Sequence, residues 1–205
     1  GRLTQLSGVT SCLPDYRLAP ESAFPAAIDD ALTAYRALAA QANGPIFLGG
    51  DSAGGGMALA LLALIRGTDL PQPVLTFALS PLTDMTFSGR SVSRNAEKEV
   101  ILPVSRLEEL RAMYLQGADS DDPRASPMFA DFRGVGPVLL AVSDAEILED
   151  DTLRMHQTLI DQQVETALIH QQGLPHVWPF FWRMLPEAND DLRKIAAAMC
   201  ARASS

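Results

Sequence analysis

The sequence predicts an α/β protein in which a doubly wound, mostly parallel sheet carries helices on both faces. Short apolar runs alternate with longer segments whose apolar residues recur at the helical period. The short runs are continuously apolar, as expected of parallel strands that are buried on both faces. One of them, at residues 45–49, leads through a glycine-rich turn into an almost wholly apolar segment. This is a strand–turn–helix unit, the repeating element of α/β folds.

The predicted elements alternate along the chain except for one long interruption. Strands are expected at residues 9–13, 45–49, 73–79, 137–142 and 165–170. Helices are expected at residues 26–40, 57–66, 104–115, 150–162 and 187–203. The excursion at residues 82–127 is too long for a simple crossover loop between two strands. With right-handed crossovers, this order gives a sheet of about five strands.

Composition and charge limit the classes of protein to consider. A length of 205 residues suits one domain, and 47% hydrophobic residues can build its core. The net charge of −9 argues against nucleic acid and anionic membrane surfaces as partners. The apolar runs are too short to span a membrane, and none follows a basic amino-terminal region as in a signal peptide. Cys12 and Cys200 do not resemble a disulfide framework, which favours a cytoplasmic location.

The most specific motif is GGDSAGGG at residues 49–56, with Ser52 at its centre. A serine on a sharp turn between a strand and a helix is typical of a nucleophile elbow. We expect glycine at positions 50 and 54 because a side chain there would collide where the strand and the helix cross. The hydroxyl of Ser52 would lie beside the helix N-terminus, whose N–H groups favour developing negative charge.

A serine nucleophile requires a base, and the base requires an acid to orient it. His156 lies in a predicted helix and His170 in a predicted strand, whereas His176 lies in the loop after the last strand. Since ligands of such sheets lie outside the carboxyl ends of the strands, we expect His176 to be the base.

For the acid, position leaves two residues open. Asp144 and Glu146 both follow the strand predicted at residues 137–142, so either could reach His176. The chain order of serine, acid and histidine is the same in both cases, and it is the order found in α/β-hydrolases.

Three motifs together resemble the bacterial hormone-sensitive lipase family of esterases, which has the α/β-hydrolase fold. They are DYRLAPE at residues 15–21 with FP at 24–25, GDSAGGG at 50–56 and PHVW at 175–178. The resemblance covers essentially the whole chain, and it implies Ser52 as nucleophile and His176 as base. The family's acid stands at the head of a D-P-L-x-D-E-like stretch, which matches residues 146–151. The resemblance therefore favours Glu146 over Asp144, with glutamate in place of the commoner aspartate.

The oxyanion hole departs from the family pattern. In the family it consists of an H-G-G-G loop and the backbone N–H of the residue after the serine, here Ala53. This sequence contains no H-G-G-G. In the family that loop precedes a helix that residues 2–7 match, so the resemblance implies an amino-terminally truncated chain. Loss of one oxyanion donor typically costs on the order of 10² to 10³ in rate, so we expect the chain alone to be impaired.

These observations predict an α/β-hydrolase catalytic domain over residues 1–205, with residues 82–127 as a candidate cap over the substrate. The expected reaction is hydrolysis of small esters with short to medium acyl chains, through a Ser-His-Glu triad and an acyl-enzyme. No metal or organic cofactor is expected, and a homodimer is a candidate assembly. Candidates for an acyl pocket are Met85, Phe87, Leu102 and Met113.

Two other functions remain open from the residues alone. The same triad could hydrolyse an amide. The fold could also serve a non-catalytic protein that binds small molecules, because fold does not fix function.

Overall fold

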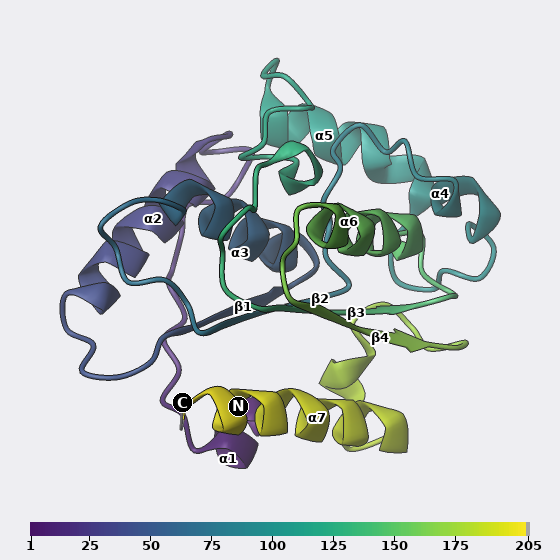
Figure 1. Ribbon diagram of the computed structural model, residues 1–205. Coiled ribbons are helices and arrows are strands. Elements are labelled where there is room, and N and C mark those ends of the chain that lie inside the picture. The colour runs from purple at the N-terminus through teal and green to yellow at the C-terminus, as the bar shows by residue number, and fades with distance from the viewer. Residues whose placement is uncertain (204–205) are drawn as a thin grey trace.

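A parallel sheet of four strands forms the middle layer of the computed structural model, which describes residues 1–203 (Figure 1). The strands are β1 (Phe47–Asp51), β2 (Leu75–Leu79), β3 (Val138–Ser143) and β4 (Thr166–Gln171). They lie side by side in chain order, and every neighbouring pair is parallel. Their carboxyl ends therefore meet along one edge of the sheet, as the sequence predicts.

Helices cover both faces of this sheet (Figure 1). On one face lie α2 (Ala26–Ala39), α3 (Ser52–Ile65) and α6 (Glu149–Asp161), and on the other lie α1 (Arg2–Ser7) and α7 (Pro186–Ala203). The predicted doubly wound α/β fold is thus confirmed. The chain between β2 and β3 carries α4 (Ser91–Arg94), η1 (Val104–Arg106), α5 (Leu107–Leu115) and η2 (Pro127–Phe129). A last short helix, η3 (Trp178–Phe181), connects β4 to α7.

The core has two layers because strand side chains alternate between the faces of a sheet. All six residues of β3 are buried. Leu140 packs in a cluster with Leu62 of α3 and Leu159 of α6, whereas its neighbour Leu139 packs with Trp178 and with residues of α7. Burial on both faces explains why the strand sequences are continuously apolar.

The predicted first strand, residues 9–13, does not form. This segment is irregular and mostly exposed, with 91% of Leu13 accessible to solvent. A strand needs a neighbour to receive its backbone hydrogen bonds, and β1 pairs within residues 1–203 only with β2. The described sheet therefore has four strands rather than about five. The other four predicted strands agree with the structure within two residues at each end.

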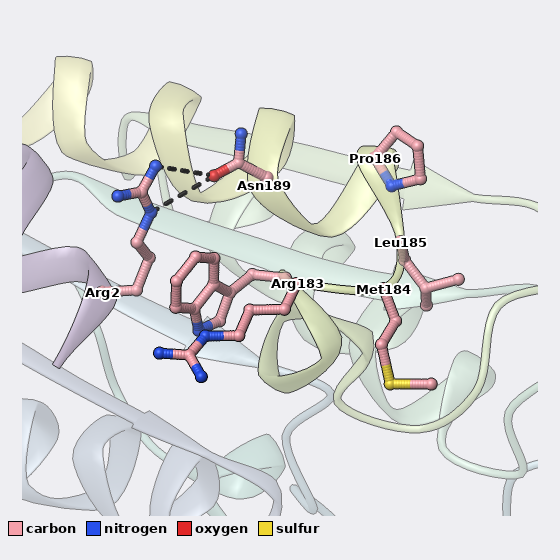
Figure 2. A pocket seen from close by; sticks show the side chains of 7 residues that line it. Arg2, Arg183, Met184, Leu185, Pro186 and Asn189 are labelled. Carbon is pink, nitrogen blue, oxygen red and sulfur yellow. Dashed lines mark hydrogen bonds between the residues drawn. The ribbon is translucent and has the colours of Figure 1, made fainter.

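The first helix is attached to the last one by an arginine (Figure 2). Arg2 donates two hydrogen bonds to the side-chain oxygen of Asn189, at 2.9 and 3.2 Å, and its guanidinium lies 4.8 Å from the centroid of the Trp182 ring. Arg183 approaches the same ring, at 4.9 Å. These residues line an open hollow of about 470 Å³ beside α7.

Among the helices of residues 1–203, none has the length and apolar character needed to cross a membrane.

Candidate active site

Ser52 lies on a strained turn between β1 and α3. Its φ of 52° is in the left-handed region, which is uncommon for a residue with a side chain and costs on the order of 1–3 kcal/mol. The carbonyl of Ser52 accepts a hydrogen bond of 3.1 Å from the backbone N–H of Leu82, just beyond β2. The turn is thus held against the neighbouring strand, in the geometry expected of a nucleophile elbow.

The glycines around Ser52 allow the close approach of three backbone segments. A Cβ atom on Gly50 would collide with the carbonyl of Gly54, and one on Gly56 would collide with the carbonyl of Leu82. A Cβ atom on Gly54 would meet nothing within 4 Å. The expectation for position 50 is therefore confirmed, and that for position 54 is wrong. Gly54 presents its backbone, not its Cα hydrogens, to the crossing strand, and the second tight contact is at Gly56.

Ser52, His176 and Glu146 form a continuous chain of hydrogen bonds. The Nε2 atom of His176 lies 2.9 Å from the hydroxyl oxygen of Ser52, and its Nδ1 atom lies 2.7 Å from Oε2 of Glu146. Because an ionised carboxylate only accepts hydrogen bonds, Nδ1 donates to it, and Nε2 of the neutral ring can accept from the serine. Glu146 is fully buried and His176 is 5% exposed. Ser52 follows β1, His176 follows β4 and Glu146 follows β3, so the carboxyl edge of the sheet brings the three residues together.

A second serine, Ser80, connects the parts of this chain. Its hydroxyl donates to Oε1 of Glu146 at 2.9 Å and accepts from the backbone N–H of Val177 at 3.1 Å. The same carboxylate oxygen accepts from the backbone N–H of Ser143 at 2.8 Å. Sequence reasoning missed Ser80, since a serine before a proline marked only the end of a strand.

The other candidate residues lie outside this chain. The carboxylate of Asp144 accepts a hydrogen bond of 2.7 Å from the backbone N–H of Gly173, in the turn after β4. The Nε2 atom of His170, near the carboxyl end of β4, lies 3.1 Å from Oε1 of Glu149. His156 lies in α6, where burial lowers its pKa. Of the two acids that position left open, the structure thus brings Glu146 and not Asp144 to His176.

Ala53 is the second residue of α3, so its backbone N–H is one of the first four in the helix, which lack a partner within it. Such N–H groups can donate to an anion at the helix N-terminus.

A cavity of about 300 Å³ opens beside Ser52 and Ala53. Most of its other walls are apolar, and many come from the excursion between β2 and β3. Its lining from this excursion comprises Leu82, Met85, Leu102, Leu107, Leu110, Met113, Tyr114, Arg124 and Ala125. Three of the four proposed pocket residues are among these. The fourth, Phe87, does not line the cavity. It packs against the cluster of Leu107, Ile147 and Leu148, of which Leu107 and Leu148 themselves line the cavity.

A buried carboxylate joins the segment after β2 to the first turn of α6. One oxygen of Asp151 accepts backbone N–H groups of Thr83 and Asp84, at 2.9 and 3.0 Å. Its other oxygen is buried without a hydrogen-bond partner in the described part of the chain. Burial, reinforced by the charge of Asp84, raises the pKa of Asp151 to about 7. Asp84 itself is also fully buried and pairs with Arg154 at 2.9 Å.

Within residues 1–203, no three His, Cys, Asp or Glu side chains are grouped so that they could hold a metal ion.

Comparisons with known proteins agree with this fold. A family model described as alpha/beta hydrolase fold matches residues 1–180. An acetyl-hydrolase of Streptomyces hygroscopicus is 36% identical over 84% of this chain and 58% of its own length. An esterase of Acinetobacter venetianus is 33% identical over 89% of this chain and 61% of its own length. This chain thus spans about three fifths of the length of these two relatives.

Solved structures extend the likeness to the whole described fold. The crystal structure of EstE5 matches 100% of this chain and 70% of its own, with 36% identity and a TM-score of 0.96. An esterase from the bacterial hormone-sensitive lipase family matches 98% and 69%, with 35% identity and a TM-score of 0.95. The chain belongs to the α/β-hydrolase family. Within it, the resemblance to bacterial hormone-sensitive lipases that the motifs indicated is confirmed.

Two glycine substitutions test the packing of the elbow. Gly50→Ala places a methyl group against backbone that cannot rotate away, so we expect a loss of about 1–3 kcal/mol in the free energy of unfolding. Gly54→Ala adds a methyl group in open space within a helix, so we expect no loss and a gain of up to about 1 kcal/mol. Urea unfolding of the two variants measures this difference. A Gly54 variant less stable than the Gly50 variant would contradict the packing described.

Replacement of Asp151 tests its burial. Its folded-state pKa of about 7 lies above the ordinary value of 3.8, so the neutral acid stabilises the fold. This stabilisation is complete below the ordinary pKa and is lost as the pH rises through 7. Asp151→Asn does not titrate. Relative to this variant, the natural protein should lose stability between pH 5 and 7, by up to about 1.4 kcal/mol per pH unit. Urea unfolding of both proteins at pH 5 and pH 7 measures this loss. If the difference in unfolding free energy between the two proteins were the same at both pH values, the raised pKa of Asp151 would be excluded.

Proposed function

We propose that the protein hydrolyses carboxylic esters, with Ser52 as nucleophile, His176 as base and Glu146 as acid. The observation that carries this proposal is the continuous hydrogen-bond chain from Glu146 through His176 to Ser52, beside an apolar cavity. The strained backbone of Ser52 supports it further, because strained residues cluster at functional sites. Relatives named acetyl-hydrolase and esterase point to the same reaction.

In the proposed mechanism, the hydroxyl oxygen of Ser52 attacks the ester carbonyl while Nε2 of His176 takes its proton. Glu146 keeps Nδ1 of the ring protonated and stabilises the imidazolium that forms. The N–H of Ala53 donates to the oxyanion of the tetrahedral intermediate. When this collapses, His176 gives the proton to the departing alcohol and an acyl-serine remains. Water, activated by the same histidine, then releases the acid and restores Ser52.

The cavity supports small substrates with an apolar acyl group. Its volume of about 300 Å³ is at the lower end for small-molecule sites, which favours short to medium acyl chains. Leu102, Leu107 and Met113 supply part of its apolar wall from the excursion. We therefore propose that residues 82–127 act as part of a substrate-covering cap.

Removal of the nucleophile tests the mechanism. In the intact protein, Ser52→Ala should lower kcat for p-nitrophenyl butyrate by at least about 10³-fold, because no other group can form the acyl-enzyme. A fluorophosphonate probe should label the natural protein at Ser52 and leave the variant unlabelled. Hydrolysis that survives the substitution would refute the proposal, and an unreactive Ser52 would favour a binding protein.

The choice of acid is tested by a matched pair. Glu146→Ala should lower kcat by about 10³-fold or more, because His176 then loses the group that orients it. Asp144→Ala removes a bond to a turn and should lower kcat by less than about tenfold. Steady-state kinetics on the intact protein compares the two, with the melting temperature as a control for folding. The reverse order of effects would make Asp144 the acid.

A further inference from the structure

We propose that Asn95 and Ser91 are positioning residues for the acid Glu146, which they orient by holding its backbone. This inference rests on the proposed function. It concerns a stretch of the excursion, residues 91–99, that does not touch Ser52 or His176 through any hydrogen bond in the described part of the chain. Neither the motifs nor the position of these residues in the sequence pointed to such a role.

Three side chains of this stretch bind consecutive backbone groups beside the acid. The amide nitrogen of Asn95 donates to the carbonyl of Glu146 itself, at 2.8 Å. The hydroxyl of Ser91 donates to the carbonyl of Ile147 at 2.6 Å. The carboxylate of Glu99 accepts the N–H of Ile147 at 3.3 Å. The peptide that follows the acid is therefore held on both sides by one segment.

The same stretch also fixes the first turn of α6, directly downstream of the acid. The hydroxyl of Ser91 accepts the backbone N–H of Asp150 at 3.0 Å, and the backbone N–H of Ser91 donates to the carboxylate of Asp150 at 3.1 Å. Asn95 donates a further bond of 3.1 Å to Glu149. The guanidinium of Arg94 forms ion pairs with Glu149 at 2.6 Å and with Asp150 at 2.8 Å. The loop from Glu146 to α6 thus cannot shift without breaking several of these bonds.

Burial makes the two principal contacts strong. Ser91, Asn95, Glu146 and Ile147 are all fully buried. Water cannot replace a hydrogen bond lost there, so a carbonyl that loses its donor keeps the full cost of desolvation. At an exposed position, water would replace the lost hydrogen bond and the cost would be smaller.

A glutamate needs such support more than an aspartate does. Its side chain has one more rotatable bond, so the position of its carboxylate depends on more torsions and costs more entropy to fix. Ser80, Ser143 and His176 hold the carboxylate end. The stretch 91–99 holds the backbone end, and together they leave the side chain one arrangement. The excursion that lines the cavity is thereby also joined to the acid.

Single substitutions in the intact protein give the first test. Asn95→Ala and Ser91→Ala should each lower kcat for p-nitrophenyl butyrate by about 10- to 100-fold, as expected when a catalytic group is slightly misplaced. KM should change by less than about threefold. Rates are divided by the fraction of sites that a fluorophosphonate titrates, which removes any unfolded protein from the comparison. Ser93→Ala, at an exposed position of the same helix, is the matched control and should leave kcat unchanged.

A double-mutant cycle separates positioning from a general structural role. If Asn95 acts through Glu146, then Asn95→Ala should change kcat by less than about twofold in a Glu146→Ala background. The same fold-loss in both backgrounds would overturn the inference. Should Asn95→Ala fail to fold, Ser91→Ala in the same cycle decides, because it removes only a hydroxyl.

If Ser52→Ala and Glu146→Ala both left hydrolysis intact, the proposed function itself would have failed. If Ser52→Ala and Glu146→Ala lowered kcat but Asn95→Ala and Ser91→Ala did not, only the positioning role would be refuted.

Discussion

The carboxylate of Glu146 is the group on which the arrangement of the site depends. It is fully buried, and a buried charge is tolerated only when donors surround it. One oxygen meets His176, and the other receives the hydroxyl of Ser80 and the backbone N–H of Ser143. Each of these donors comes from a different strand end, so satisfying the carboxylate also fixes the ends of β2, β3 and β4 relative to one another.

Three of the six non-glycine residues with positive φ in residues 1–203 belong to the hydrogen-bond network of this carboxylate. Ser52, Ser80 and Val177 all have φ near 50°, in the left-handed region, and none is a glycine. Each such residue costs on the order of 1–3 kcal/mol and persists only when its surroundings hold it. The hydrogen bonds between Ser80 and Val177 and between Leu82 and Ser52 provide that hold. The strain is spread over three strand ends, and the buried sheet beneath them supplies the rigid base.

Features that depend on local sequence pattern can be predicted from this chain, whereas features that depend on a distant partner cannot. Four of the five predicted strands form, and these four were recognisable because their continuous apolar character follows from burial on both faces. Residues 9–13 have the composition of a strand, but composition cannot supply the neighbour that a strand requires. Similarly, the loops after the strands pointed to Ser52 and His176. Asp144 and Glu146 follow the same strand, so position left both open and only the family resemblance favoured Glu146; in the fold, Glu146 and not Asp144 lies within hydrogen-bond distance of His176. Ser80 and Asn95 could not be recognised, because serine and asparagine are common in turns and carry no pattern of their own.

The excursion between β2 and β3 shows why a long insertion can be retained at that place in the sheet. A connection there leaves β2, after which Leu82 binds the carbonyl of Ser52, and returns to β3, which leads to Glu146. It therefore passes over the carboxyl edge of the sheet. Its later part, from Leu102 to Ala125, lines the cavity beside Ser52. Its earlier part, residues 91–99, contacts the backbone of the acid loop. In the proposed enzyme, the segment that contacts the acyl group would thus also set the geometry of the acid. A change in its length or packing should therefore alter turnover as well as substrate preference.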